Sequence, residues 1–222
     1  MLETDISAEN FLVEYGNKNL TIAFAGLSNG LHEVRHDFYN LTSGESCSKI
    51  FCKDPSELWY QSGVDSKLDS IEKLLTRLKE EVAIIKPEKI TCIGISAGGH
   101  AALLFGALLN VDIVHAFGPQ AFLSAKNWKK FNMGIFLQEK IDSLHSRYGI
   151  DGEYFDIKRF LEKTTKPIYN IHVCQSYIWD LKQTYYLGEL PNVRVVEYDC
   201  NEHAPASYLK RVDKLKDVIL IK

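Results

Sequence analysis

The sequence predicts an α/β protein with a mostly parallel central sheet and helices on both faces. Short apolar segments rich in β-branched residues alternate along the chain with longer segments of helical periodicity. Neighbouring parallel strands need crossover connections, which are usually helices. This alternation therefore favours a sheet that helices cover on both sides. The 222 residues are 45% hydrophobic and 25% charged, an ordinary globular composition. We therefore expect residues 1–222 to form a single domain.

The first half of the chain contains an edge strand, two further strands and two helices. The expected strands are residues 11–15, 20–25 and 49–52, and the expected helices are residues 31–39 and 66–85. Leucine, isoleucine and valine recur at three- and four-residue steps through the longer helix, which indicates one buried face. Pro87 then separates this helix from the next strand.

The second half continues the alternation but contains one irregular segment. The expected strands are residues 90–95, 111–117, 168–174 and 193–198. One helix is expected directly after residue 96, and three more at residues 138–148, 180–187 and 205–220. Residues from about 120 to 165 break the rhythm and carry several aromatic side chains. We expect them to form a short cap-like insertion over the carboxyl ends of the strands. Its aromatic residues either line a pocket or form a small core of their own.

The junction after residues 90–95 carries the clearest chemical motif. Its pattern is Gly-x-Ser-x-Gly-Gly, with Ser96 in the middle and an alanine- and leucine-rich helix behind it. Such a strand–turn–helix is typical of a nucleophile elbow, in which a strained turn exposes a serine hydroxyl. Gly94 and Gly98 flank the turn, where a Cβ would press on neighbouring backbone. Ser96 is the candidate nucleophile; the alternative is a glycine-rich turn with an incidental serine.

A serine hydroxyl needs a base to remove its proton, and the base needs an acid to orient it. His203 lies in the loop after the last expected strand and is the candidate base. Asp180 follows the preceding strand and is the candidate acid, although it could instead cap a helix. Asp199 and Glu202 are reserve candidates that would have to fold back onto the histidine.

Two backbone N–H groups are expected to bind the oxyanion of a tetrahedral intermediate. One belongs to Ala97, directly after the candidate nucleophile, and the other to Leu27, in the glycine-bearing loop after residues 20–25. Ser28 adjoins this loop, where it either contacts substrate or caps the following helix.

Three aromatic residues lie near expected strand ends and are candidates for substrate binding. Trp59 follows the strand 49–52, and Tyr177 and Trp179 follow the strand 168–174. Their rings could stack on a sugar, with ordinary packing as the alternative. The histidines at 115 and 172 lie on expected strands and are interpreted as core residues.

Several classes of ligand have no sequence signal. No cluster of histidine and carboxylate residues has metal-ligand spacing, and no glycine-rich nucleotide motif occurs, so we expect no metal or cofactor. The net charge of −3 does not indicate the basic surface that proteins use to bind nucleic acid. No apolar run is long enough to span a membrane, and the acidic N-terminus does not resemble a signal peptide. Nothing in the sequence sets the oligomeric state.

The cysteine content predicts a reducing compartment. Five cysteines, an odd number, occur without a Cys-x-x-Cys pair. Four of them lie in or beside expected strands, which favours free buried thiols over disulfides or metal ligands. We therefore expect a cytoplasmic protein.

These residues resemble the α/β-hydrolase superfamily. The resemblance rests on the Gly94–Gly99 elbow, on the order Ser96, Asp180, His203, and on the insertion after the strand that follows the elbow helix. It covers the chain from about residue 20 and implies a sheet of eight or slightly fewer strands and cofactor-free acyl-enzyme chemistry. Residues 24–27, 53–60 and 115–120 also look like small hydrolase-like proteins linked to bacterial surface glycans. A His-Gly-Gly-Gly oxyanion loop, found in many esterases, is missing.

The sequence thus favours a serine esterase or thioesterase acting on a small ester through an acyl-enzyme on Ser96. An O-acylated carbohydrate is one candidate substrate. Two alternatives stay open: an acyltransferase that uses the same three residues, and a binding or scaffold protein on a hydrolase fold that has lost turnover.

Overall fold

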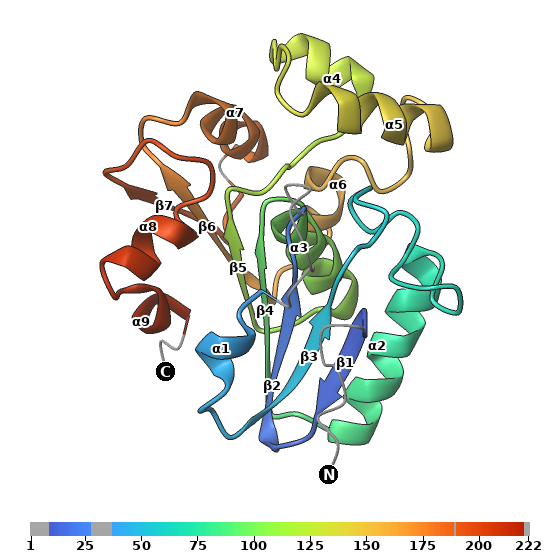
Figure 1. The fold of residues 1–222 in the computed structure, drawn as a ribbon, viewed down its shortest axis with the longest axis vertical. Coiled ribbons are helices and arrows are strands. Elements are labelled where there is room, and N and C mark those ends of the chain that lie inside the picture. Colours follow the sequence, from blue (N-terminus) through green and yellow to red (C-terminus); the bar gives the residue numbers. More distant parts are fainter. Residues whose placement is uncertain (1–8, 28–36, 189, 220–222) are drawn as a thin grey trace.

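A computed structural model describes residues 9–27, 37–188 and 190–219. Its central element is one seven-stranded sheet in the order β1-β3-β2-β4-β5-β6-β7 (Figure 1). The edge strand β1 is antiparallel to β3, and every other neighbouring pair is parallel. The strands are β1 (Phe11–Glu14), β2 (Asn17–Phe24), β3 (Cys47–Cys52), β4 (Lys89–Ile95), β5 (Ile113–Phe117), β6 (Ile168–Cys174) and β7 (Val193–Tyr198). The predicted α/β fold with a mostly parallel sheet is confirmed.

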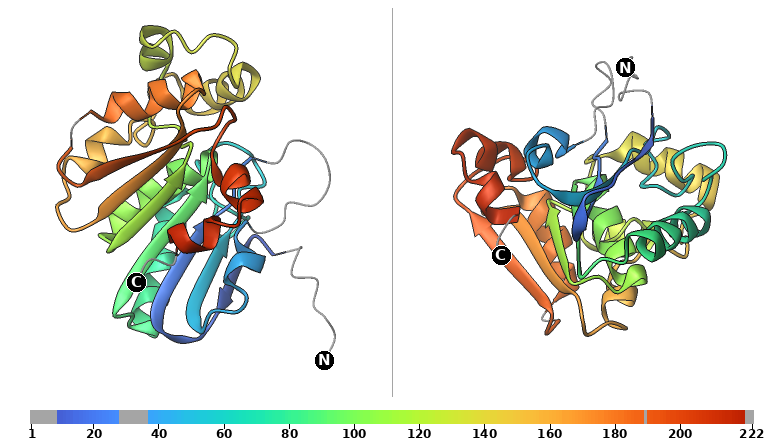
Figure 2. Two further views of the ribbon diagram at one scale, coloured as in Figure 1. Left: turned by 90° about the vertical axis from the view of Figure 1, so that its left-hand side faces the viewer. Right: turned by 90° about the horizontal axis from the view of Figure 1, so that it is seen from below.

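Helices cover both faces of this sheet. Successive residues of a strand point to opposite faces, so Ile22 of β2 packs with one set of helices and Ala23 with the other. The first face carries α2 and α3, and the second carries α1, α8 and α9 (Figure 2). The helices are α1 (Tyr39–Thr42), α2 (Ile71–Ile85), α3 (Ala97–Leu109), α4 (Ala125–Lys130), α5 (Gln138–Tyr148), α6 (Lys158–Leu161), α7 (Ile178–Leu187), α8 (Ala206–Arg211) and α9 (Leu215–Ile219).

The segment between β5 and β6 carries α4, α5 and α6 and has its own apolar cluster. This cluster includes Trp128 and Leu144 from the segment, and it extends to Ala97 at the start of α3. Figure 1 shows α4 and α5 beyond the end of the sheet to which β5 leads. The side chains of this segment therefore reach the elbow that follows β4.

Two expected helices differ from the structure. The helix expected at residues 66–85 begins at Ile71, because the Ser70 hydroxyl accepts a hydrogen bond from the Lys73 N–H and caps it there. The helix expected at residues 205–220 is broken into α8 and α9, with Asp213 between them at φ 54°. Most of the helix expected at residues 31–39 lies outside the described residues.

Two of the five cysteines form a disulfide, which corrects the expectation of free thiols throughout. Cys174, at the end of β6, is bonded to Cys200, after β7, with the Cα atoms 4.9 Å apart. These strands are parallel neighbours, so residues 26 positions apart in sequence meet at one edge of the sheet. The other three, Cys47, Cys52 and Cys92, are free, and the last two of them are buried as expected.

In the described ranges, no helix has the length and apolar character needed to cross a membrane. The longest of them, α2, has 15 residues, whereas a span needs about 20.

Candidate active site

Ser96 lies in the sharp turn between β4 and α3. Its backbone has φ 53° and ψ −117°, a conformation that non-glycine residues rarely adopt. Two backbone hydrogen bonds hold it there: the Ser96 N–H donates to the Phe117 carbonyl at 2.8 Å, and the Ser96 carbonyl accepts from the His100 N–H at 3.0 Å. A strained residue persists only where its surroundings over-determine it, and these contacts do so here.

The two glycines that flank the serine are required by close backbone approach. A Cβ on Gly94 would lie 2.0 Å from the Gly98 carbonyl oxygen, and a Cβ on Gly98 would lie 2.1 Å from that of Phe24. Both distances are far inside van der Waals contact. The local sequence therefore permits this turn because it has no side chains at these two positions.

The structure brings Ser96, His203 and Asp180 together in one chain of hydrogen bonds. His203 Nε2 lies 2.8 Å from the Ser96 hydroxyl oxygen, and His203 Nδ1 lies 2.8 Å from Asp180 Oδ1. A carboxylate can only accept, so Nδ1 carries the hydrogen and Nε2 is left to accept from the serine hydroxyl. The Asp180 side chain is buried, whereas that of His203 is 30% exposed.

Two further contacts fix the Asp180 carboxylate. Its second oxygen accepts a hydrogen bond from the Ala204 N–H at 2.9 Å, so one carboxylate binds both the histidine and the backbone after it. A Cβ on Gly118, which has φ 54°, would lie 2.6 Å from Asp180 Oδ2. The turn after β5 therefore needs glycine to admit the carboxylate. The reserve acids are placed elsewhere: Asp199 is exposed and Glu202 pairs with Arg211 at 2.6 Å.

The loop after β2 and the start of α3 adjoin the hydrogen-bonded residues Ser96, His203 and Asp180. Ala97 is the first residue of α3 and is buried, and Leu27 packs against the apolar cluster of the insertion. The Gly26 N–H donates to Asp37 Oδ2 at 3.0 Å, which ties the loop down one residue before Leu27. Burial raises the pKa of Asp37, and this hydrogen bond opposes the shift. Ser28 lies outside the described residues, and the oxyanion-binding roles of Leu27 and Ala97 stay predictions.

Trp59 is in the core, which corrects its expected place in a substrate-binding surface. The side chain is fully buried, and the indole N–H donates to Gln120 Oε1 at 2.9 Å. The Asp54 carboxylate accepts from the N–H groups of Leu58 and Tyr60, both at 2.8 Å, and so folds this loop inward. A ring with no exposed face cannot stack on a sugar.

Tyr177, by contrast, lies against His203, and Trp179 lies next to it through Phe136, one of the insertion aromatics that were expected to line a pocket or form a small core. The Tyr177 ring centroid is 5.7 Å from that of His203. Phe136, in the loop between α4 and α5, packs edge-to-face on His203 at 5.7 Å and stacks on Trp179 at 5.8 Å. Its role depends on the path of a long insertion, for which the sequence holds no local signal.

The remaining strand histidines are core residues, as expected. His115 Nδ1 lies 3.0 Å from His172 Nε2, and His172 Nδ1 lies 2.9 Å from the Tyr198 hydroxyl. Burial lowers the pKa of both, to about 4 for His115 and about 3 for His172. Across the described part of the chain, no group of three or more histidine, cysteine or acidic side chains is arranged to hold a metal ion.

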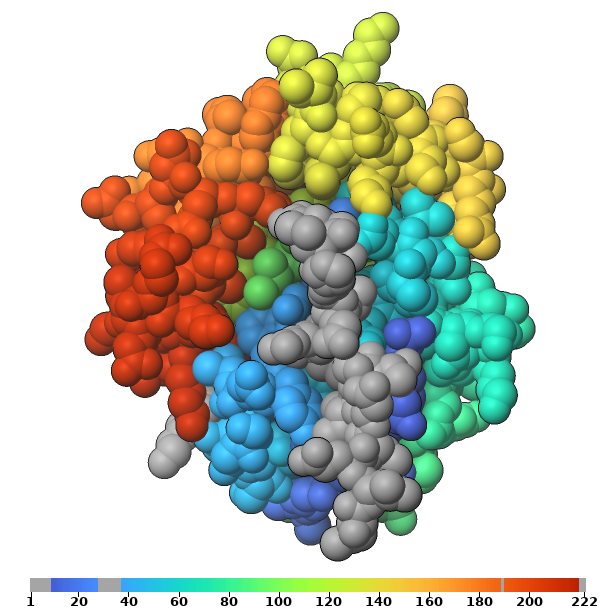
Figure 3. Space-filling view, viewed as in Figure 1, coloured from blue at the N-terminus to red at the C-terminus, as the bar shows by residue number. Residues whose placement is uncertain are grey.

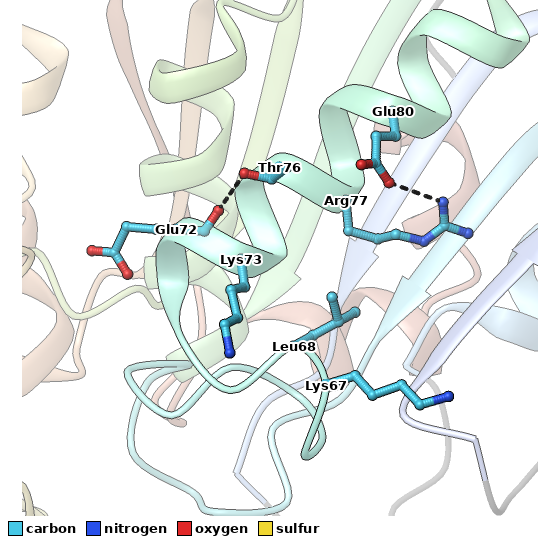
Figure 4. A pocket seen from close by; sticks show the side chains of 7 residues that line it. All are labelled: Lys67, Leu68, Glu72, Lys73, Thr76, Arg77 and Glu80. Atoms are coloured by element: carbon cyan, nitrogen blue, oxygen red, sulfur yellow. Dashed lines mark hydrogen bonds and ion pairs between the residues drawn. The ribbon is translucent and has the colours of Figure 1, made fainter.

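A depression of about 320 Å³ over α2 is separate from the site. Its charged side chains form ion pairs: Arg77 lies 3.5 Å from Glu80 (Figure 4), and Lys73 lies 2.8 Å from Asp69 outside the lining. No residue of the candidate site lines it. The lining consists of Lys67, Leu68, Glu72, Lys73, Thr76, Arg77 and Glu80.

Comparison with known proteins identifies the fold. By sequence, neither a family model nor a curated protein matches the chain. Among solved structures, a capsule O-acetyltransferase of Neisseria meningitidis serogroup A is similar, with a TM-score of 0.62 and 15% identity over 93% of this chain and 90% of that one. The fluorophosphonate-binding serine hydrolase F of Staphylococcus aureus matches with a TM-score of 0.60 and 14% identity over 94% and 86%.

A third similar structure is the glycosylation-associated Gap123 complex of Streptococcus agalactiae. The TM-score is 0.60 at 15% identity, over 94% of this chain and 43% of that one. At such identities the likeness concerns the fold alone. The chain has the α/β-hydrolase fold, as the sequence resemblance implied, and its structural neighbours include serine hydrolases, esterases and O-acetyltransferases.

Proposed function

We propose that the protein is a serine-dependent esterase or thioesterase that acts on small acyl esters. The observation that carries this proposal is the unbroken chain of 2.8 Å contacts from the Ser96 hydroxyl through His203 to the buried Asp180 carboxylate. A serine held in this way gains a base for its proton, and the base gains a carboxylate for the charge that develops on it.

In the proposed reaction, Ser96 Oγ attacks the carbonyl carbon while its proton passes to His203 Nε2. The tetrahedral intermediate holds its oxyanion on the Leu27 and Ala97 N–H groups. It then loses the alcohol or thiol, which takes the proton from His203, and an acyl-serine remains. Water attacks this ester by the same route in reverse, which releases the acid and restores the serine. No metal or cofactor takes part in these steps.

Acyl transfer is the second candidate function, in which an alcohol takes the place of water. The likeness to a capsule O-acetyltransferase, at a TM-score of 0.62, supports keeping it. An O-acylated carbohydrate is accordingly our proposed substrate class for either reaction. A binding or scaffold role is the third reading, and the intact hydrogen-bonded chain argues against it.

Hydrolysis of p-nitrophenyl esters of rising acyl length tests the proposal, with Ser96→Ala as the matched control. We expect the unmutated protein to release p-nitrophenol and the variant to fall to the rate without protein. Activity that survives in Ser96→Ala would contradict the proposed nucleophile. Added alcohol that diverts product from acid to ester would favour acyl transfer.

The cytoplasmic location stays a prediction. It rested on free cysteines, of which three of the five remain. Fractionation of the source cells checks it, and recovery outside the cytoplasm would overturn it.

A further inference from the structure

Two aromatic side chains pack on His203, and a third packs behind one of them. Phe136 and Tyr177 each place a ring centroid 5.7 Å from that of the imidazole, and Trp179 stacks on Phe136. Phe136 comes from the insertion and the other two from the start of α7, so two separate parts of the chain meet at this histidine. Figure 3 shows the surface of the insertion (yellow) adjoining that of α7 (orange).

We propose that Phe136 and Tyr177 form the subsite for the alcohol part of the ester, and that they select a neutral, ring-bearing alcohol such as a sugar hydroxyl. This inference rests on the proposed function and assigns the alcohol side of the same site.

Proton transfer fixes where that alcohol must lie. His203 Nε2 gives its proton to the leaving oxygen, and in acyl transfer it takes one from the incoming hydroxyl. That oxygen must therefore come within hydrogen-bond reach of Nε2, about 3 Å. Side chains packed directly on the imidazole border this position, whereas those near the oxyanion loop and the elbow border the acyl group. Among the described residues, the aromatic rings packed on His203 are those of Phe136 and Tyr177. Both come from outside the loop that carries the histidine.

Phe136 is held in this position from behind. Its ring stacks on Trp179 with an interplanar angle of 2°. The Lys182 ammonium lies 4.6 Å from the Trp179 ring centroid and donates to the Asn132 carbonyl at 2.7 Å. Lys182 thus links α7 to the loop that carries Phe136. A ring fixed in this way acts as a rigid wall, which is what discrimination between alcohols requires.

The surroundings of the two rings indicate a neutral partner with an apolar face. Ile135, beside Phe136, is 90% exposed, and Ile178, beside Tyr177, is 54% exposed. The nearby ammonium of Lys182 is already engaged by Trp179 and a carbonyl. Sugar rings present C–H faces that pack on aromatic rings, and the Tyr177 hydroxyl can hydrogen-bond to their hydroxyl groups. Burial and the nearby Asp180 raise the pKa of Tyr177, which keeps that hydroxyl protonated.

The test measures how the acyl-enzyme divides between water and added alcohols. p-Nitrophenyl acetate supplies the acetyl group, and methanol, cyclohexanol and methyl glucoside compete with water for it. Phe136→Ala is the main variant, Phe136→Leu keeps the bulk without the ring, and Phe131→Ala is the matched control. Phe131 is another insertion phenylalanine, and it packs on Phe122 and Tyr186 rather than on His203.

We expect the unmutated protein to favour methyl glucoside and cyclohexanol over methanol. Phe136→Ala should reduce that preference about tenfold, Phe136→Leu should restore part of it for cyclohexanol only, and Phe131→Ala should leave it unchanged. Tyr177→Phe should weaken the preference for methyl glucoside alone. Dependence of the rate on acyl chain length should be the same in all variants.

Two results would overturn the inference in different ways. An unmutated protein that forms no acyl-serine removes the proposed function and the subsite with it. An acyl-serine that forms normally, with an alcohol preference that Phe136→Ala leaves unchanged or that Phe131→Ala changes equally, removes the subsite alone.

Discussion

Two groups of hydrogen-bonded histidines, His203 alone and the pair of His115 and His172, differ in what the imidazole contacts. His203 bonds to the Asp180 carboxylate on one side and to the Ser96 hydroxyl on the other, and its side chain is 30% exposed. His115 and His172 bond to each other and are 5% and 2% exposed. A buried imidazole without a carboxylate stays neutral, because nothing compensates the lost hydration of its cation. A hydrogen-bonded histidine is therefore a candidate base only where a carboxylate can stabilise its charge.

The largest expected effect separates the two groups by activity. His203→Gln should lower the rate of ester hydrolysis by about 10⁴-fold or more, because the serine loses its base. His172→Gln should leave the rate within a few-fold, because His172 contacts His115 and Tyr198 rather than the serine. Steady-state rates of both variants, with circular dichroism to verify folding, check this. Equal losses in the two variants would erase the distinction.

The next largest expected effect concerns the role of the Asp180 carboxylate. Asp180→Asn keeps the shape but offers an amide to His203 Nδ1, which favours the wrong tautomer, so we expect the rate to fall by about 10³- to 10⁴-fold. The measurement is kcat with p-nitrophenyl acetate over a range of pH. A variant that retains more than a tenth of the activity would show that the Asp180 carboxylate has no part in the chemistry.

The disulfide joins the strand ends that precede the loops of Asp180 and His203. Cys174→Ala/Cys200→Ala should lower the free energy of unfolding by about 3 kcal/mol, the loss typical of a closed loop of this length. Urea unfolding of the oxidised and reduced protein measures the same difference without mutation. A midpoint that does not move, when mass spectrometry shows the two thiols reduced, would contradict a bond that constrains these loops.

The smallest expected effect is a pH dependence of stability that arises from the buried pair of His115 and His172. The folded pKa of His115 is lowered from 6.5 to about 4 by burial, so the unfolded chain binds more protons between these values. The stabilising contribution of this histidine is therefore fully present above pH 6.5 and decreases as the pH falls. At pH 5 the free energy of unfolding is lower by about 2 kcal/mol for one such histidine. We expect the loss between pH 7.5 and 5 to be smaller in His172→Gln, measured by urea unfolding. The same loss in both proteins would show that the pair does not contribute.

Part of the site could be predicted because its causes are local or follow from topology. The elbow at Ser96 depends on glycines two residues to either side, so its sequence and its geometry are inseparable. Asp180 and His203 could be identified because the loops after adjacent parallel strands come to one edge of the sheet. Apolar runs predicted β4 and β6 to within one residue, because most residues of these central strands are buried.

The rest depends on contacts between distant residues. Trp59 turns inward because the Asp54 carboxylate binds the backbone around it, and nothing in the spacing of aromatic residues indicates this. Phe136 reaches His203 across an irregular insertion. Cys174 and Cys200 pair because β6 and β7 are neighbours, which the positions of the cysteines in the sequence do not reveal.

The most direct test of the account is covalent labelling of Ser96. The protein is incubated with a fluorophosphonate, which reacts with activated serines, and the modified peptide is mapped by mass spectrometry. We predict a single adduct on Ser96 that disappears in Ser96→Ala and forms far more slowly in His203→Gln. An unmutated protein that stays unlabelled, or that labels equally fast without His203, would contradict the claim that this hydrogen-bonded chain activates the serine.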